Sequence, residues 1–166
     1  MKSQEKKYLV DSFTAIEKLL KEKGANIKQE IVSTHYYGQH TGNDVEKFVE
    51  YVDRYEVHAL KEEDGKFTMT EHKQIADKNT GIAWLKGKGY TNANIVKMVY
   101  TEYEYKDGTV GLYTINDFLK SVILYYPPDQ HAVMEKEFGL QNAEVITIPY
   151  NKYLEHLGRS RLMKLL

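Results

Sequence analysis

Two groups of side chains in this sequence could do chemistry, and both fall in stretches that are predicted to be strands. Near the start, Glu5 and Lys7 alternate along an extended stretch, so they share one face of that strand. A carboxylate can hold a divalent cation, and an ammonium group can meet a phosphate oxygen. Glu/Lys alternation is also common at solvated strand edges, and both interpretations stay open.

The second group surrounds a predicted turn. His58 and His72 flank Asp64-Gly65 almost symmetrically, so they lie across a hairpin or one register apart. Two histidines and a carboxylate can bind a transition metal, but the strand register decides whether they share a face. Structural or surface histidines are the alternative that the pattern favours. The charged residues close to them in sequence are Arg54, Glu56 and Glu71.

Hydrophobic periodicity and turn residues predict the elements that position these groups. Asp64-Gly65 and Asp107-Gly108 predict hairpins, because Gly adopts positive φ without steric cost. The segment 45–52 could instead begin as a helical turn. Strands are expected over 6–10, 27–37, 48–61, 66–75, 94–105, 109–115 and 118–126. Helices are expected from a cap at Asp11 or Ser12 to Gly24, and over 80–86, 129–138 and 150–157, while the tail 158–166 is expected to end as a helix packing its leucines.

Composition excludes several classes of protein. The 166 residues, 42% hydrophobic and 28% charged, suit a single domain spanning 1–166. A net charge of -1 gives no overall field that would recruit nucleic acid or a membrane. The absence of cysteine excludes a disulfide scaffold, a zinc ribbon and thiol catalysis. No signal-like start and no run of about 20 apolar residues is present, so we expect a cytoplasmic protein without membrane or nucleic-acid partners.

The fold is expected to be rich in strands. Most of the 14 tyrosines fall in predicted strands, where aromatic residues fit a pleated surface. Strands joined as antiparallel neighbours, with helices interposed, indicate an α+β fold. We predict an antiparallel barrel or tunnel of about eight strands with flanking helices. The same order of elements occurs in both halves of the chain: a helix ended by Gly, followed by two strands joined by an Asp-Gly hairpin. The sequences of the two halves show no matching repeat.

The stretch from Ser3 to Val10 resembles the opening strand of the CYTH superfamily, the triphosphate tunnel enzymes that include class IV adenylyl cyclases and thiamine triphosphatases. That family opens with Glu-x-Glu-x-Lys and a hydrophobic run. Glu5 and Lys7 match the second acid and the lysine, whereas Ser3 stands where the first acid belongs. The resemblance implies a tunnel in which Glu5 helps to hold Mg²⁺ or Mn²⁺ and Lys7 meets phosphate.

The resemblance extends over nearly the whole chain, but the departures weaken the case for catalysis. Arg54 is the only arginine outside the C-terminal tail, although family tunnels bind triphosphate with several. Val99 occupies an expected arginine position, and 118–126 has no carboxylate where the family shows Glu-x-Glu. The similar segments are the helix ending near Gly24, the strand end Thr34 to Tyr37, Gly65 to Thr70, Gly89-Tyr90 with Val96-Lys97, and Pro149 to Leu154.

Three hypotheses about function follow. The leading one is a CYTH-like protein that binds a phosphorylated or otherwise anionic small ligand without full metal-dependent catalysis. The second is a divergent metal-dependent triphosphate hydrolase or adenylyl cyclase, and the third is a non-enzymatic protein-interaction module. Whether the chain is an enzyme stays open. The candidate ligand contacts are Lys7, Arg54, His58, Lys61, His72 and Lys97, and the rearranged metal ligands of the second hypothesis would come from Glu5, Glu56, Glu71, Glu102 or Glu104.

Overall fold

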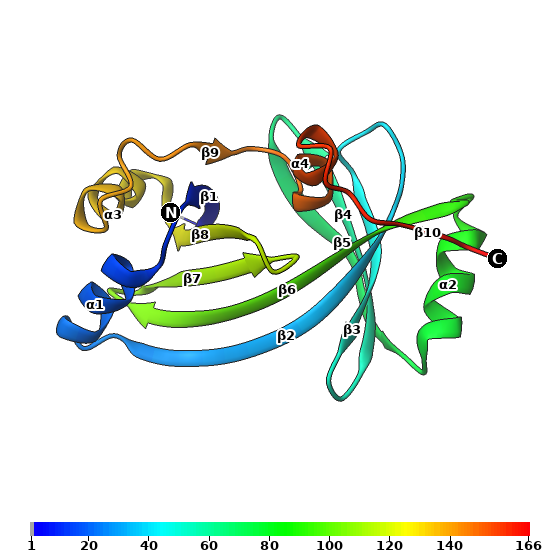
Figure 1. Ribbon diagram of the computed structural model, residues 1–166, viewed down its shortest axis with the longest axis horizontal. Coiled ribbons are helices and arrows are strands. Elements are labelled where there is room, and N and C mark those ends of the chain that lie inside the picture. Colours follow the sequence, from blue (N-terminus) through cyan, green and yellow to red (C-terminus); the bar gives the residue numbers. More distant parts are fainter. Residues whose placement is uncertain (1) are drawn as a thin grey trace. The chain divides into compact units, whose positions relative to one another are not determined.

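A computed structural model describes residues 2–166 of the chain (Figure 1). It confirms the predicted α+β class, with antiparallel strand pairing. Among these residues, no helix is long and apolar enough to cross a membrane. The strands are β1 (Gln4–Val10), β2 (Asn26–Gly38), β3 (Val45–Tyr51), β4 (Tyr55–Glu63), β5 (Lys66–Ile75), β6 (Asn92–Tyr105), β7 (Gly108–Ile115), β8 (Leu119–Tyr126), β9 (Val145–Ile146) and β10 (Leu162–Lys164). The helices are α1 (Thr14–Glu22), α2 (Lys78–Gly87), α3 (His131–Glu137) and α4 (Tyr150–His156), with the 3-10 turn η1 (Pro128–Gln130).

The chain divides into two compact units. Unit 1 comprises the residues up to Ile31 together with Val99–Thr147, and unit 2 comprises Val32–Met98 with Ile148–Leu166. The strand order is β2-β6-β7-β8-β1-β9 in unit 1 and β5-β4-β3-β2-β6 in unit 2, where β10 also pairs with β6. The long strands β2 and β6 contribute residues to both units.

Unit 1 buries one face of its strands against α1 and α3. Tyr8 and Leu124 belong to this core, together with Leu20 of α1 and Met134 of α3. The 3.6-residue spacing therefore predicted the apolar face of α1 correctly. Because side chains alternate along a strand, the neighbour of Tyr8, Lys7, lies on the opposite face.

Unit 2 is built in the same way around α2. Leu85 of α2 packs in one cluster with Phe48 of β3 and Val57 of β4. The approach is close at Gly81, where a Cβ atom would come within 2.5 Å of the Phe48 ring. Packing against α2 thus fixes which face of β3 and β4 is apolar, and the alternate residues lie on the other face.

The structure corrects three local expectations. The predicted run 48–61 is two strands, β3 and β4, separated by a turn at which Val52 is exposed, and 45–51 is strand and not helical turn. The tail forms β10 on β6 instead of a helix end. The Asp64-Gly65 hairpin is confirmed, with positive φ at both residues. In the second hairpin positive φ falls on Lys106 and Asp107, one residue earlier than predicted.

Candidate functional site

The β4–β5 hairpin of unit 2 brings together Glu56, His58 and His72, which we call the His–Glu cluster. His58 and His72 are direct cross-strand partners. The sequence left two registers open for this pair, and the structure selects the one in which they face each other. Glu56 lies two residues before His58 on the same strand, so its side chain shares that face. All three residues therefore lie on the side opposite the α2 core.

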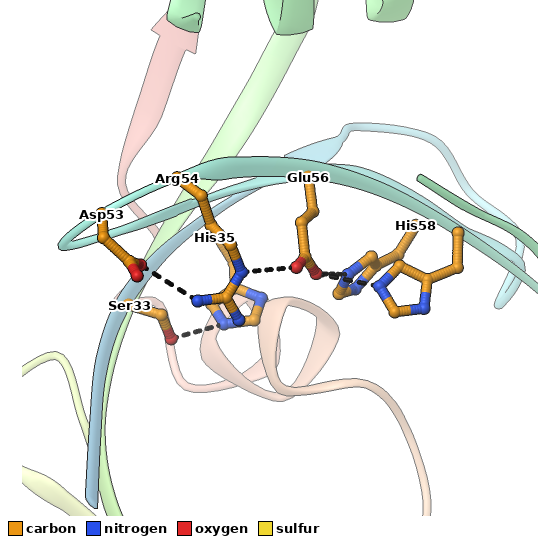
Figure 2. Close-up of polar contacts among 7 residues, drawn as sticks. Ser33, His35, Asp53, Arg54, Glu56 and His58 are labelled. Atoms are coloured by element: carbon orange, nitrogen blue, oxygen red, sulfur yellow. Dashed lines mark hydrogen bonds and ion pairs between the residues drawn. The ribbon is translucent and has the colours of Figure 1, made fainter. Parts of the chain in front are cut away.

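The two imidazoles converge on a single carboxylate oxygen (Figure 2). His58 Nε2 and His72 Nε2 each lie 2.9 Å from Glu56 Oε1. The rings meet edge to face, with centroids 4.6 Å apart. One potential ligand atom from each residue lies within 4.8 Å of the other two. The cluster is therefore compact enough to hold one metal ion.

Arg54 fixes the other oxygen of the same carboxylate. Its Nε donates to Glu56 Oε2 at 2.7 Å, and its Nη1 donates to Asp53 Oδ1 at 3.0 Å. The guanidinium lies over the Tyr51 ring, 4.0 Å from the ring centroid. Charge-assisted hydrogen bonds of this kind hold a carboxylate in one orientation. Glu56 is therefore positioned by Arg54 and shared by both histidines.

Burial and hydrogen bonding set the charge states in the cluster. Burial alone would raise the pKa of Glu56, but hydrogen bonds from Arg54, His58 and His72 outweigh burial and lower that pKa to about 2. Burial lowers the pKa of His58 to about 4, although its hydrogen bond to Glu56 acts in the opposite direction. At neutral pH the buried members are thus a carboxylate and a neutral imidazole.

The same face of unit 2 continues across β3 and β2. Lys47 is the cross-strand partner of His58, and its Nζ donates to the Tyr37 hydroxyl at 3.4 Å. His35 is buried, with Nε2 2.9 Å from Ser33 Oγ. Burial and then the nearby charges of Lys47 and His58 hold the pKa of His35 well below its usual range. Sequence reasoning did not single out Lys47 as part of the site, and it included His35 and Tyr37 only within the family-like strand end Thr34 to Tyr37.

The structure brings together three of the six predicted ligand contacts. Arg54, His58 and His72 meet at Glu56. Lys61 is exposed, and strand alternation puts it with Val57 on the opposite face of β4. Lys97 lies on β6, where alternation puts it on the face of Ala93, a residue of the α2 core cluster.

Lys7, the sixth predicted contact, belongs to unit 1. It is half-buried and lies on the same face of β1 as Glu5, directly opposite Ile123 of β8. Burial lowers the pKa of Lys7 to about 8, while the negative charge of Glu5 acts to raise it. Glu5 and Ile123 also line an open cavity of about 230 Å³, to whose lining Lys7 itself does not belong. The cavity is lined by Glu5, Lys28, Glu102, Thr109, Gly111, Tyr113, Ile123 and Tyr125.

The carboxylates considered as rearranged metal ligands do not form one group. Glu5 and Glu102 line the unit 1 cavity, and Glu104 lines a second depression together with Ser3. Glu71 pairs with Ala59 in the register of the β4–β5 hairpin, next to but not within the His–Glu cluster. Over residues 2–166, the one group of three ligands close enough to hold a metal is Glu56, His58 and His72.

Several solved structures resemble this chain, whereas no protein-family model and no curated protein matches its sequence. The PH1012 protein of Pyrococcus horikoshii has a TM-score of 0.75 and 14% identity, over 89% of this chain and 96% of that one. A candidate adenylate cyclase from Vibrio parahaemolyticus has a TM-score of 0.68 and 13% identity, over 93% and 98%. A candidate adenylyl cyclase from Hippeastrum, with a dominant triphosphatase activity, has a TM-score of 0.59 and 10% identity, over 96% and 97%. At these identities the likeness is one of fold.

Proposed function

We propose that this chain, whose fold is CYTH-like, binds a phosphorylated or otherwise anionic small ligand. One protein of similar fold has a dominant triphosphatase activity, so this fold can accommodate a triphosphate. We further propose that residues 1–166 act as one domain, because β2 and β6 each contribute residues to both units.

The observation that carries the proposal is the half-buried ammonium group of Lys7, whose same-face neighbour Glu5 and cross-strand partner Ile123 line the unit 1 cavity. Removing an ammonium group from water is costly, and an anionic oxygen placed next to it offsets that cost. Lys28 lines the cavity and adds a second cation, while Glu5 acts electrostatically on Lys7. Lysines act as point charges, so we expect selection for negative charge more than for phosphate geometry.

The other predicted contacts rank lower. Arg54, His58 and His72 already make hydrogen bonds to Glu56, so an anion would have to compete with that carboxylate for them. Lys61 lies 3.8 Å from Glu63 in an exposed ion pair, and such pairs are weak. Lys61 and Lys97 belong to unit 2, and a role for them as ligand contacts stays a prediction.

A CYTH-like fold implies Mg²⁺ or Mn²⁺, but the residues present do not fit a magnesium site. Magnesium prefers oxygen ligands in a near-octahedral arrangement. The compact ligand group in the described part of the chain supplies two imidazole nitrogens and one carboxylate. Glu5 lines the unit 1 cavity with Glu102, yet no third ligand joins them there among residues 2–166. Ligand binding by Lys7 is therefore proposed without magnesium.

Isothermal titration calorimetry with tripolyphosphate and with ATP tests the proposal. We expect both to bind wild-type protein without Mg²⁺, and Lys7→Met to weaken binding by about tenfold or more, as expected for a lost charge-assisted contact. Lys2→Met is the control, because Lys2 is exposed. Absence of heat at millimolar ligand, or equal affinity in the two variants, would overturn the proposal.

Catalysis is the second candidate function. It is favoured by the fact that Glu5 and Glu102 line one cavity with Lys28, so that acid and cationic groups face the same space. The expected reaction is hydrolysis or cyclisation of a nucleoside triphosphate. Release of phosphate or pyrophosphate from ATP would be measured, and Glu5→Gln should abolish it. Equal release by wild type and Glu5→Gln would reject this candidate.

A further inference from the structure

We propose that the His–Glu cluster binds a divalent first-row transition-metal ion of the Zn²⁺ class. The ligand atoms are His58 Nε2, His72 Nε2 and Glu56 Oε1. This site lies in unit 2 and is separate from the anion contact proposed at Lys7 in unit 1. The inference therefore goes beyond the proposed function and does not depend on it.

The positions of the ligand atoms suit such an ion. Zn–N and Zn–O bonds are about 2.1 Å long. Each histidine nitrogen lies 2.9 Å from Glu56 Oε1, so an ion at bonding distance from both atoms would see them about 90° apart. That angle is the one between neighbouring ligands in a facial two-histidine, one-carboxylate site. The ligand atoms lie within 4.8 Å of one another, and to share one ion the two histidine nitrogens must be no more than about 4.2 Å apart, twice the bond length.

The donor set selects the class of ion. Imidazole nitrogen is a good ligand for Zn²⁺, Co²⁺, Ni²⁺ and Fe²⁺, whereas Mg²⁺ and Ca²⁺ prefer oxygen. In the cluster without metal, each Nε2–H donates to Glu56 Oε1. Coordination through Nε2 requires the neutral tautomer that carries its proton on Nδ1. The two hydrogen bonds are thereby replaced by three metal–ligand bonds, from the two Nε2 atoms and the shared Oε1, without net loss of a proton.

The surroundings resemble the support that metal ligands usually have. Arg54 holds Oε2 of Glu56, which leaves Oε1 directed at the two imidazoles. The side chains of Glu56 and His58 are 12% and 11% exposed, whereas that of His72 is 54% exposed. An ion can therefore reach the cluster from solvent on the His72 side. Three protein ligands leave further coordination positions for water or an anionic ligand.

The charges around the cluster provide an independent test. Glu56 and Asp53 favour a cation, and Arg54 and Lys47 oppose it. Lys47 is the cross-strand partner of His58, and its charge acts on both His58 and His35. Lys47 Nζ donates to the Tyr37 hydroxyl. Removing its charge in Lys47→Met should therefore strengthen metal binding severalfold, because one repulsive charge is lost.

The alternative is that the cluster is a purely structural network of hydrogen bonds. Such a network would tolerate loss of Lys47 without any effect on metal ions, and it would have no preference for Zn²⁺ or Co²⁺ over Mg²⁺. The two explanations therefore differ in what a metal titration would show.

Visible absorption of Co²⁺ and calorimetry with Zn²⁺, on the untagged full chain without phosphate, test the proposal. We expect one equivalent of Co²⁺ to give ligand-field bands, Zn²⁺ to displace it, and excess Mg²⁺ to leave it bound. His72→Gln should lower the Zn²⁺ affinity by at least about tenfold. His156→Gln is the matched control, since His156 is an exposed histidine of α4 outside the cluster.

The proposal is overturned if wild type gives no Co²⁺ bands, or if His72→Gln binds Zn²⁺ as tightly as His156→Gln. His72 is half-exposed, so its variant should stay folded, and circular dichroism would verify this. If His72→Gln does unfold, Zn²⁺ binding by Lys47→Met tests the site instead. Binding that is unchanged or weaker than in wild type would contradict the proposal. Because phosphate is absent, failure here leaves anion binding at Lys7 unaffected.

Discussion

His58 and His72 face each other across the β4–β5 hairpin, with their rings edge to face and 4.6 Å between centroids. Both donate to the same oxygen of Glu56, whose second oxygen accepts from Arg54. Three groups that could each meet an anion thus depend on one carboxylate. The cluster in unit 2 therefore offers imidazole nitrogens and a carboxylate, whereas β1 of unit 1 offers the ammonium group of Lys7.

Glu56→Gln should destabilise the protein by about 1–3 kcal/mol at pH 7, because a buried charged acceptor with three donors is lost. Glutamine keeps the size of the side chain, so the effect reports on charge and hydrogen bonding. Urea unfolding measures it. Glu63→Gln is the control, since the Glu63 side chain is 76% exposed and pairs only weakly with Lys61. Equal midpoints for the two variants would contradict the central role of Glu56.

Lys7 should make stability depend on pH above neutrality. At pH 7 it is charged in the folded and unfolded chains, so the cost of burying the charge is fully present. As pH rises from about 8 toward 10.5, the folded chain loses this proton first, and the cost is relieved. Lys7→Met should therefore be more stable than wild type by roughly 2 kcal/mol at pH 7, and the difference should shrink by pH 10. The measurement is the urea unfolding midpoint of each variant at both pH values, with Lys2→Met as the reference. A stability difference that does not depend on pH would contradict the lowered pKa of Lys7.

Anion binding at Lys7 should be accompanied by proton uptake. With its pKa lowered to about 8, Lys7 is about half charged at pH 8, and a bound anion raises that pKa again. Binding of tripolyphosphate at pH 8 should then take up as much as about half a proton. Calorimetry in two buffers of different ionisation enthalpy measures this uptake. Heats that do not depend on the buffer would place the anion elsewhere.

Gly81→Ala should destabilise α2 packing despite the better helix propensity of alanine. A Cβ atom at position 81 would come within 2.5 Å of the buried Phe48 ring, so the ring or the helix must shift. We expect a loss of about 1–3 kcal/mol. Gly87→Ala, in the same helix, meets nothing within 4 Å and should be neutral or slightly stabilising. Thermal unfolding compares the two, and similar melting temperatures would mean that the packing at Gly81 is loose.

Local patterns in the sequence were sufficient for much of the fold. Asp64-Gly65 predicted its hairpin because such a pair readily takes positive φ at both positions. The strand predicted over 6–10 is confirmed, and the structure begins it two residues earlier, as β1 (Gln4–Val10). The turn between β3 and β4 was missed, because the sequence around Val52 has neither Gly nor Pro to indicate it. The strand β10 was missed because three residues carry no periodic signal, and their pairing with β6 is long-range.

The sequence by itself determined that Glu56 and His58 share a strand face, since side chains alternate with a period of two residues. Regular pairing outward from the Asp64-Gly65 turn would place His58 opposite Glu71. The register shifts between Ala59 and Leu60, and His58 therefore faces His72. Only the tertiary structure decided this, because a β-bulge depends on the pairing of two strands and their packing, not on the local sequence of either one.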